Sequence, residues 1–220
     1  TRSAEGGYGF GLQVIDGASV QADNAVIDGN AVFGVLADGD GTTVTLTGGR
    51  ICGTLLGTEE TGSVGPGLGA QNGAAVTATA LDISRNEGPG LYVVSENSSL
   101  SCTDCTIAEN QFGGAVAVAG GTLDLDGSTI TGTQESANLG GGTGIYAAEM
   151  DGLGPTVTVT DSTITDNEVA GVQLSGRLFA QLMDNTISGG TGQEHGVTTR
   201  CGDGIYATGT SAWSDGQGVL

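Results

Sequence analysis

Residues 154–172, GPTVTVTDSTITDNEVAGV, alternate apolar and polar side chains, and the alternation breaks at Asp161 and again at Asn167. Alternation with a period of two indicates β-strands, because successive side chains of a strand point to opposite faces. The turn-forming residues divide the stretch into pieces too short for a helix or for one hairpin. The stretch therefore predicts several short strands joined by tight turns.

The same pattern recurs along the whole chain. Eight glycines, 23 to 33 residues apart, each precede an apolar–x–apolar triplet: Gly11, Gly34, Gly67, Gly90, Gly114, Gly144, Gly171 and Gly204. A second strand pattern lies inside each period, and a further apolar residue follows its start by seven positions: Val20 to Ile27, Val44 to Ile51, Val76 to Ile83, Leu100 to Ile107, Leu123 to Ile130, Val157 to Ile164 and Ala180 to Ile187. A repeat of this length indicates a solenoid.

None of the predicted strands can bury its apolar side chains alone, but stacked coils can bury one another. We therefore predict an all-β fold, a single-stranded parallel β-helix of about eight coils with three short strands each, about 38 Å long. Asparagines that follow the isoleucines by three positions are expected to hydrogen-bond from coil to coil: Asn30, Asn86, Asn110 and Asn167. The pattern is present at Gly9 and unfinished at Leu220, so we expect residues 1–220 to be one domain of a longer protein.

Two phrases, TVTDSTITDNEVAGVQL at residues 158–174 and LSCTDCTIAENQFGGAVAV at residues 100–118, resemble the right-handed parallel β-helix repeats of the pectin-lyase-like superfamily. The resemblance extends from about Gly9 to Ala207 and implies a right-handed coil in a bacterial secreted or surface protein. That superfamily includes polysaccharide lyases, hydrolases, epimerases, adhesins and phage tail fibres, so the resemblance selects no activity.

The charge of the chain limits its partners. It has 25 acidic residues, five arginines and no lysine, and its formal net charge is −20. A basic surface for phosphate groups is missing, which excludes nucleic acid as a partner. No apolar run approaches the roughly 20 residues that cross a bilayer. We expect an extracellular or cell-surface protein without a membrane span.

Three coils are longer than the others at one corner. The next anchor glycine follows the isoleucine by seven positions in four coils and by 16, 14 and 17 positions in the other three. The additional residues lie in Cys52–Pro66, Thr131–Thr143 and Ser188–Asp203, and such loops commonly carry function in solenoids. Candidate ligand-binding residues in these loops are Glu59, Glu60, Glu135, Glu194, His195 and Arg200. The alternative is that longer loops are merely tolerated there.

The middle residue of each glycine-anchored triplet is expected to face solvent: Gln13, Leu36, Gly69, Tyr92, Val116, Tyr146, Gln173 and Tyr206. A row containing Tyr92, Tyr146 and Tyr206 beside polar loops suits sugar rings, which stack on aromatic side chains. The alternative is that tyrosine is simply a good strand residue.

The second strand of each coil presents a row of hydroxyl side chains: Thr45, Thr47, Thr77, Thr79, Ser101, Thr103, Thr158 and Thr160. A flat Thr-x-Thr array resembles the ice-binding face of some antifreeze solenoids. The high strand propensity of threonine is the alternative explanation. Acidic and other residues interrupt the row.

Asp124 and Asp126 project from the same strand face, about 6.6–7 Å apart by strand rise. Paired acids at this separation can act in an inverting glycosidase. The equivalent residues of the neighbouring coils are Ser or Thr and supply no third carboxylate and no base. A weak cation site or a solvated face is the alternative.

Smaller signals point to metal and sulfur chemistry. Asp38 and Asp40 in ADGDGT are candidate Ca²⁺ ligands, although the remaining ligands of a calcium loop are absent. No other cofactor is expected. Cys102 and Cys105 form a C-x-x-C, for which a local disulfide or two buried thiols are the expected states.

The leading functional hypothesis is a non-catalytic module that binds or displays a glycan or another cell-surface component. The alternative is a polysaccharide lyase or glycoside hydrolase, and the third is an ice-binding protein. Uncapped β-edges at the two ends of the stack also favour end-to-end self-association.

Overall fold

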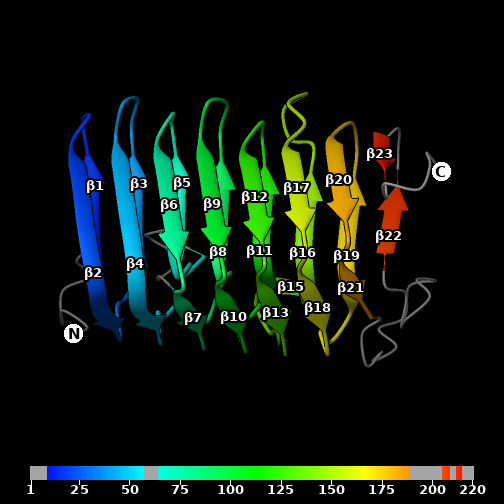
Figure 1. Ribbon diagram of the computed structural model, residues 1–220, viewed down its shortest axis with the longest axis horizontal. Coiled ribbons are helices and arrows are strands. Elements are labelled where there is room, and N and C mark those ends of the chain that lie inside the picture. The colour runs from blue at the N-terminus through cyan, green and yellow to red at the C-terminus, as the bar shows by residue number, and fades with distance from the viewer. Residues whose placement is uncertain (1–8, 57–63, 189–204, 209–211, 215–220) are drawn as a thin grey trace.

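The computed structural model describes residues 9–56, 64–188, 205–208 and 212–214, with side chains through residue 188. These residues form 23 strands and no helix. The strands stack as successive coils along one axis (Figure 1). No described helix is long and apolar enough to cross a membrane. The predicted all-β solenoid is therefore confirmed.

One strand of every coil belongs to an eight-stranded parallel sheet, the first wall. Its members in order are β1 (Phe10–Ile15), β3 (Phe33–Asp38), β5 (Leu68–Gln71), β8 (Leu91–Val94), β11 (Gly113–Val118), β16 (Thr143–Ala148), β19 (Ala170–Ser175) and β22 (Ile205–Thr208).

The other strands of the coils form a sheet of 13 strands that makes up the second and third walls. The second wall holds β6 (Ala75–Thr79), β9 (Ser99–Thr103), β12 (Thr122–Asp126), β17 (Thr156–Thr160), β20 (Phe179–Met183) and β23 (Ala212–Ser214). The third holds β7 (Asp82–Ser84), β10 (Thr106–Ala108), β13 (Thr129–Thr131), β18 (Thr163–Thr165) and β21 (Thr186–Ile187). In the first two coils a single long strand forms both walls: β2 (Ser19–Asp28) and β4 (Thr43–Cys52).

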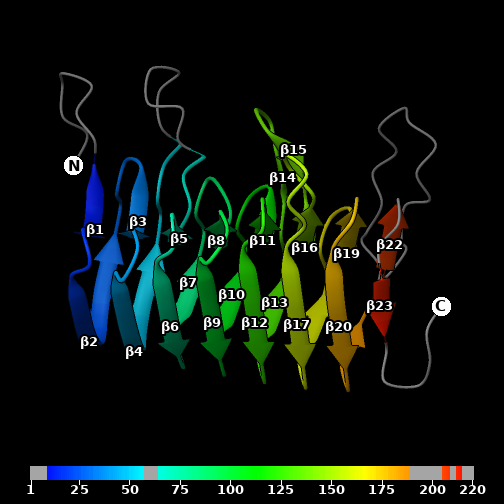
Figure 2. The same cartoon turned by 90° about the horizontal axis from the view of Figure 1, so that it is seen from above.

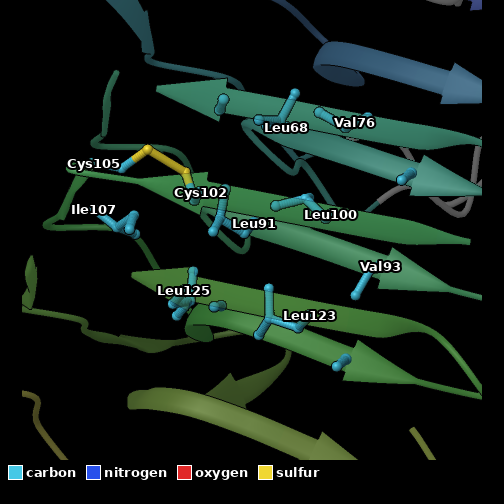
Figure 3. Packing of buried hydrophobic residues seen from close by; sticks show 14 of the residues in the cluster. Leu68, Val76, Leu91, Val93, Leu100, Cys102, Cys105, Ile107, Leu123 and Leu125 are labelled. Carbon is cyan, nitrogen blue, oxygen red and sulfur yellow. A yellow bond between two sulfur atoms is a disulfide. The ribbon is translucent and has the colours of Figure 1, made fainter. Parts of the chain in front are cut away.

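The inward side chains stack in register along the axis, as predicted. Ile83 pairs with Ile107, Ile107 with Ile130, and Ile130 with Ile164. All four isoleucines are fully buried. Leucines and valines of the first two walls form parallel columns beside them (Figure 3). Stacking buries these side chains because each coil covers the apolar surface of its neighbours.

The repeated glycine at the start of each triplet is required by lack of space. A Cβ atom on Gly90 would lie 2.7 Å from Asn110 Nδ2, from the Gly114 carbonyl oxygen and from Ile107 Cγ2. Gly67 and Gly144 face the same combination of a glycine carbonyl, an isoleucine and an asparagine. Each of these glycines therefore lies where the corner between two coils is packed too closely for a side chain. We call the repeated asparagines, Asn30, Asn86, Asn110 and Asn167, the asparagine ladder.

A single left-handed residue turns the chain between the second and third walls. In the third to sixth coils this residue is Ala80, Asp104, Gly127 and Asp161, with φ between 50° and 57°. The residue after it points inward, as the hydroxyls of Ser128 and Ser162 show: Ser128 Oγ accepts a hydrogen bond from the Cys105 amide, and Ser162 Oγ accepts one from the Ser128 amide.

Cys105 occupies this inward turn position and forms a disulfide with Cys102 of β9 (Figure 3). Their Cα atoms are 5.9 Å apart, and both residues are buried. The bond therefore ties strand to turn within one coil. Cys52 is a buried free thiol, and burial, with the nearby Asp28 carboxylate, raises its pKa. Cys201 lies outside the described residues.

Candidate functional site

The predicted middle row of the first wall is in register. Gln13, Leu36, Gly69, Tyr92, Val116, Tyr146, Gln173 and Tyr206 pair one after another along the sheet. The expectation that the whole row faces solvent is wrong, since Leu36 and Val116 are only 4% and 1% exposed and Gly69 is buried. Other side chains must therefore cover the outside of this wall.

Phe33 covers the first part of the row. A Cβ on Gly69 would lie 2.7 Å from Phe33 Cε1, so the ring of Phe33 rests against the glycine of the next coil. Phe10 stacks on Phe33 with ring centroids 6.1 Å apart. Together with Val32 and Leu36 these rings form a small apolar cluster outside the sheet.

A second external cluster covers the middle of the row. Phe112 meets Tyr146 edge to face, with ring centroids 5.9 Å apart. Beneath these rings Val116, Val118 and Ala148 are buried. Tyr92 packs against both external clusters, and burial raises the pKa of its phenol.

We call Phe10, Phe33, Tyr92, Phe112 and Tyr146 the aromatic band. Apart from Phe33, which is 9% exposed, its side chains are partly exposed, so the band has an apolar underside and an accessible outer surface. Tyr92 and Tyr146 are two coils apart, about 9.6 Å at the β-sheet spacing. A ligand that contacted both rings would have to run parallel to the rod. The side chain of Tyr206 lies outside the described part of the structure.

Two of the extended corners, the first of which the structure describes only in part, lead into strands of the same wall. The second of them, Thr131–Thr143, contains the hairpin β14 (Glu135–Ser136) and β15 (Gly140–Gly141), which projects beyond the stacked coils (Figure 2). Glu135 opens this hairpin and is half-buried. The other corner candidates, Glu59, Glu60, Glu194, His195 and Arg200, lie outside the described residues.

The following coil holds the start of this hairpin through two side chains. Asn167 Oδ1 accepts a hydrogen bond of 3.1 Å from the Thr133 amide. Glu168 Oε2 accepts one of 2.7 Å from the Glu135 amide. A carboxylate that accepts from a backbone N–H makes a charge-assisted hydrogen bond, which is stronger than a neutral one.

The first extended corner is held in the same way. Asn86 Oδ1 accepts from the Thr54 amide at 3.0 Å, and Glu87 Oε2 accepts from the Leu56 amide at 2.8 Å. The same device thus occurs in two separate coils. We call these pairs, Asn86–Glu87 and Asn167–Glu168, the corner latches.

The sequence contains the signal for the corner latches, although the prediction missed it. Threonine replaces asparagine at the ladder position of the two described long corners, at Thr54 and Thr133. The Asn-Glu dipeptide occurs only in the coils that follow them, whereas Asn30 and Asn110 precede alanine and glutamine.

The second latch connects to the aromatic band through the hairpin. The Gly142 amide donates to the Phe112 carbonyl at 2.8 Å. Gly141 also packs against Phe112, since a Cβ there would collide with both the backbone and the ring. Glu168 therefore fixes the hairpin, and the hairpin fixes Phe112 against Tyr146.

Glu168→Ala is expected to loosen the hairpin without unfolding the coils. Losing a charge-assisted hydrogen bond costs about 1.5–3 kcal/mol locally, so amide exchange in residues 134–142 should rise about tenfold or more. Hydrogen exchange followed by mass spectrometry measures this change. Glu96→Ala, at an exposed turn, is the matched control. Unchanged exchange in the hairpin of the Glu168 variant would contradict the latch.

The hydroxyl rows of the second wall are in register along the sheet. Thr45, Thr77, Ser101, Asp124, Thr158 and Gln181 form one column, and Thr47, Thr79, Thr103, Asp126, Thr160 and Met183 form the next. Asp124 and Asp126 are exposed, and their neighbours on either side are hydroxyl residues. The described residues directly beside this pair in the sheet therefore supply no cation and no base.

Side chains of the next coil form hydrogen bonds with Asp38, at the acidic turn that ends β3. The two carboxylate oxygens of Asp38 accept hydrogen bonds from Asn72 Nδ2 at 2.8 Å and from Gln71 Nε2 at 3.0 Å. Asp40 is exposed. Across the described part of the chain, no three or more His, Cys, Asp or Glu side chains gather as metal ligands. In this arrangement Asp38 acts as a turn acceptor.

Comparison with known proteins identifies the repeat. A family model described as a right handed beta helix region matches residues 5–152, which is more than half of the chain. No curated protein and no solved structure matches the chain.

Proposed function

The chain belongs to the right-handed beta helix family, and from this premise we propose that it is a non-catalytic module that binds a polysaccharide along its aromatic band. The supporting observation is that Tyr92 and Tyr146 lie in one column of the first wall, over an apolar layer that immobilises them. We propose that it acts outside the cell or at the cell surface.

The rigidity of the band favours binding. Pyranose rings present C–H faces that pack on aromatic side chains, while their hydroxyls bond to polar groups at the margin. Rings that are already packed lose little conformational entropy when a ligand covers them, so more of the contact energy contributes to affinity. The stack places Tyr92 and Tyr146 in one column, so a long polymer lying along the axis can contact both rings.

Tyr146→Ala is expected to weaken polysaccharide binding about tenfold or more, because a buried aromatic contact commonly contributes over 1 kcal/mol. Isothermal titration and affinity electrophoresis against a polysaccharide panel measure the loss. Thr158→Ala, on the second wall, is the control and should bind like the wild type. Equal binding by the Tyr146 variant and the wild type would contradict the proposal.

The enzymatic alternative has a separate test. A lyase or hydrolase would release unsaturated or reducing sugar from polysaccharide, and Asp124→Ala or Asp126→Ala would abolish that release. Binding by the band requires no product and should survive both substitutions.

The hydroxyl columns of the second wall support a second candidate, ice binding. Threonine methyl and hydroxyl groups repeat there at fixed coil spacing in β4, β6 and β17, and Asp124 and Asp126 divide the array. Inhibition of ice recrystallisation, lost in Thr45→Lys, would support this candidate, and its absence would eliminate it.

A further inference from the structure

We infer that the ligand of the aromatic band is a polycation, and we assign it to the polymers of unacetylated amino sugars. This inference rests on the proposed function and adds the chemical class of the sugar. It follows from the charges that border the band.

Carboxylates follow both long edges of the aromatic band. At the end of the first-wall strands, Glu96 lies two residues after β8, and Glu149 directly follows β16. At the corner edge lie the latch residues Glu87 and Glu168 and the hairpin residue Glu135. The described strands that carry Tyr92 and Tyr146 are thus bordered by acids at both ends.

The described arginines do not balance these acids. Arg177 is the arginine near the band, and its Nη2 lies 3.0 Å from Glu149 Oε1 in an exposed ion pair. Hydrogen bonds from Arg177 hold the pKa of Glu149 below its usual range. Arg50 lies on β4 in register with β7 and belongs to the third wall. Arg85 follows β7 at the turn towards the corner edge, where it is outnumbered by Glu87, Glu135 and Glu168. The rims of the band therefore remain negative.

The width of the first wall makes these charges effective at its centre. A six-residue strand such as β16 spans about 20 Å, so a chain lying along the band is about 10 Å from either edge. This distance is about one Debye length at 0.1 M ionic strength. The rims therefore attract a cation and repel uronates and sulfated glycans, as does the formal net charge of −20.

An amino-sugar polymer satisfies the ring geometry and the charge together. Its pyranose rings stack on the aromatic side chains, and its ammonium groups can lie over tyrosine faces or near the carboxylates. Its regular covalent repeat matches a rod that presents equivalent positions at equal intervals. A basic peptide supplies the charge but not the flat saccharide faces, so it is tested as a competing outcome.

The experiment compares oligomers of glucosamine and N-acetylglucosamine of equal length, which differ in charge and acetylation but share one backbone. Titrations are run at slightly acidic pH, where the amine is protonated and the carboxylates remain ionised. We expect the glucosamine oligomer to bind at least tenfold more tightly at low salt. Its advantage should fall as salt is raised to about 0.5 M, since salt shortens the Debye length.

Two double variants with the same change in net charge separate local from global electrostatics. Glu96→Gln with Asp151→Asn removes two exposed carboxylates from the turns that follow β8 and β16. Asp124→Asn with Asp126→Asn removes two exposed carboxylates from the second wall. The first should weaken glucosamine binding about fivefold, and the second should change it by less than about twofold. Equal effects of the two double variants would overturn the assignment to the band.

The outcomes distinguish this inference from the proposed function. If both oligomers bind equally and salt has no effect, or if polygalacturonate binds as tightly as the glucosamine oligomer, the assignment of the ligand as a polycation is wrong. The proposed binding of a saccharide would still stand. The assignment is also overturned, in favour of a basic protein, if polylysine binds as tightly as the glucosamine oligomer and Tyr146→Ala does not change that binding. If no saccharide binds, the proposed function fails as well.

Discussion

Asn110→Ala is expected to lower the free energy of unfolding by about 4 kcal/mol. Asn110 is fully buried in the ladder, where its Oδ1 accepts hydrogen bonds from the Asn86 amide and from Asn86 Nδ2. Its Nδ2 donates to the Ile83 carbonyl at 2.9 Å. Alanine removes all three hydrogen bonds and leaves the Asn86 amide and Asn86 Nδ2 buried without this acceptor. Each buried group left without a partner costs about 1–3 kcal/mol.

Urea unfolding followed by circular dichroism measures this loss. In a chain of this size it corresponds to a fall in the thermal midpoint of about 10 °C. Asn138→Ala makes the same change at an exposed position of the hairpin and should have little effect. The ladder would not stabilise the stack as described if the two variants unfolded at the same urea concentration.

Gly90→Ala is expected to destabilise the protein by about 3 kcal/mol or more, although it adds only one methyl group. The new Cβ would lie 2.7 Å from three atoms, two of which belong to the backbone of Gly114 in the next coil and to the buried side chain of Ile107. Neither can move without separating the coils, and overpacking in a rigid core commonly costs about 1–3 kcal/mol or more.

Gly152→Ala is the matched control for this prediction. Gly152 has φ of 77°, and no atom lies within 4 Å of the place that a Cβ would take, so alanine there meets backbone strain but no collision. That strain costs about 1–2 kcal/mol. A smaller loss for Gly90→Ala than for Gly152→Ala in urea unfolding would show that the anchor glycines serve another purpose.

The coil and its register could be predicted because both depend on short-range periodicity. Strand alternation determines which side chains point inward, and the constant seven-residue offset determines that Ile83 falls beside Ile107. The structure has this register at every coil for which both strands are described.

The surface of the first wall could not be predicted in the same way. Alternation gives the direction of a side chain, but its exposure depends on what neighbouring coils place over it. Leu36 and Val116 point outward as expected and are nevertheless buried, because large aromatic side chains lie over them. The contact between Phe33 and Gly69 joins residues 36 positions apart, beyond the reach of any local pattern.

By itself, therefore, the sequence determined the β-helix and its register, because both repeat with the coil. It also determined the position of the two long corners that the structure describes, because they interrupt the repeat length. Tertiary structure alone decided which outward residues are covered, which carboxylates hold the corners, and that Cys102 joins Cys105. These features depend on contacts between different coils, or on side-chain positions within a folded turn, and neither follows from the repeat. The candidate site belongs to this second group, since the rings of the aromatic band come from different coils.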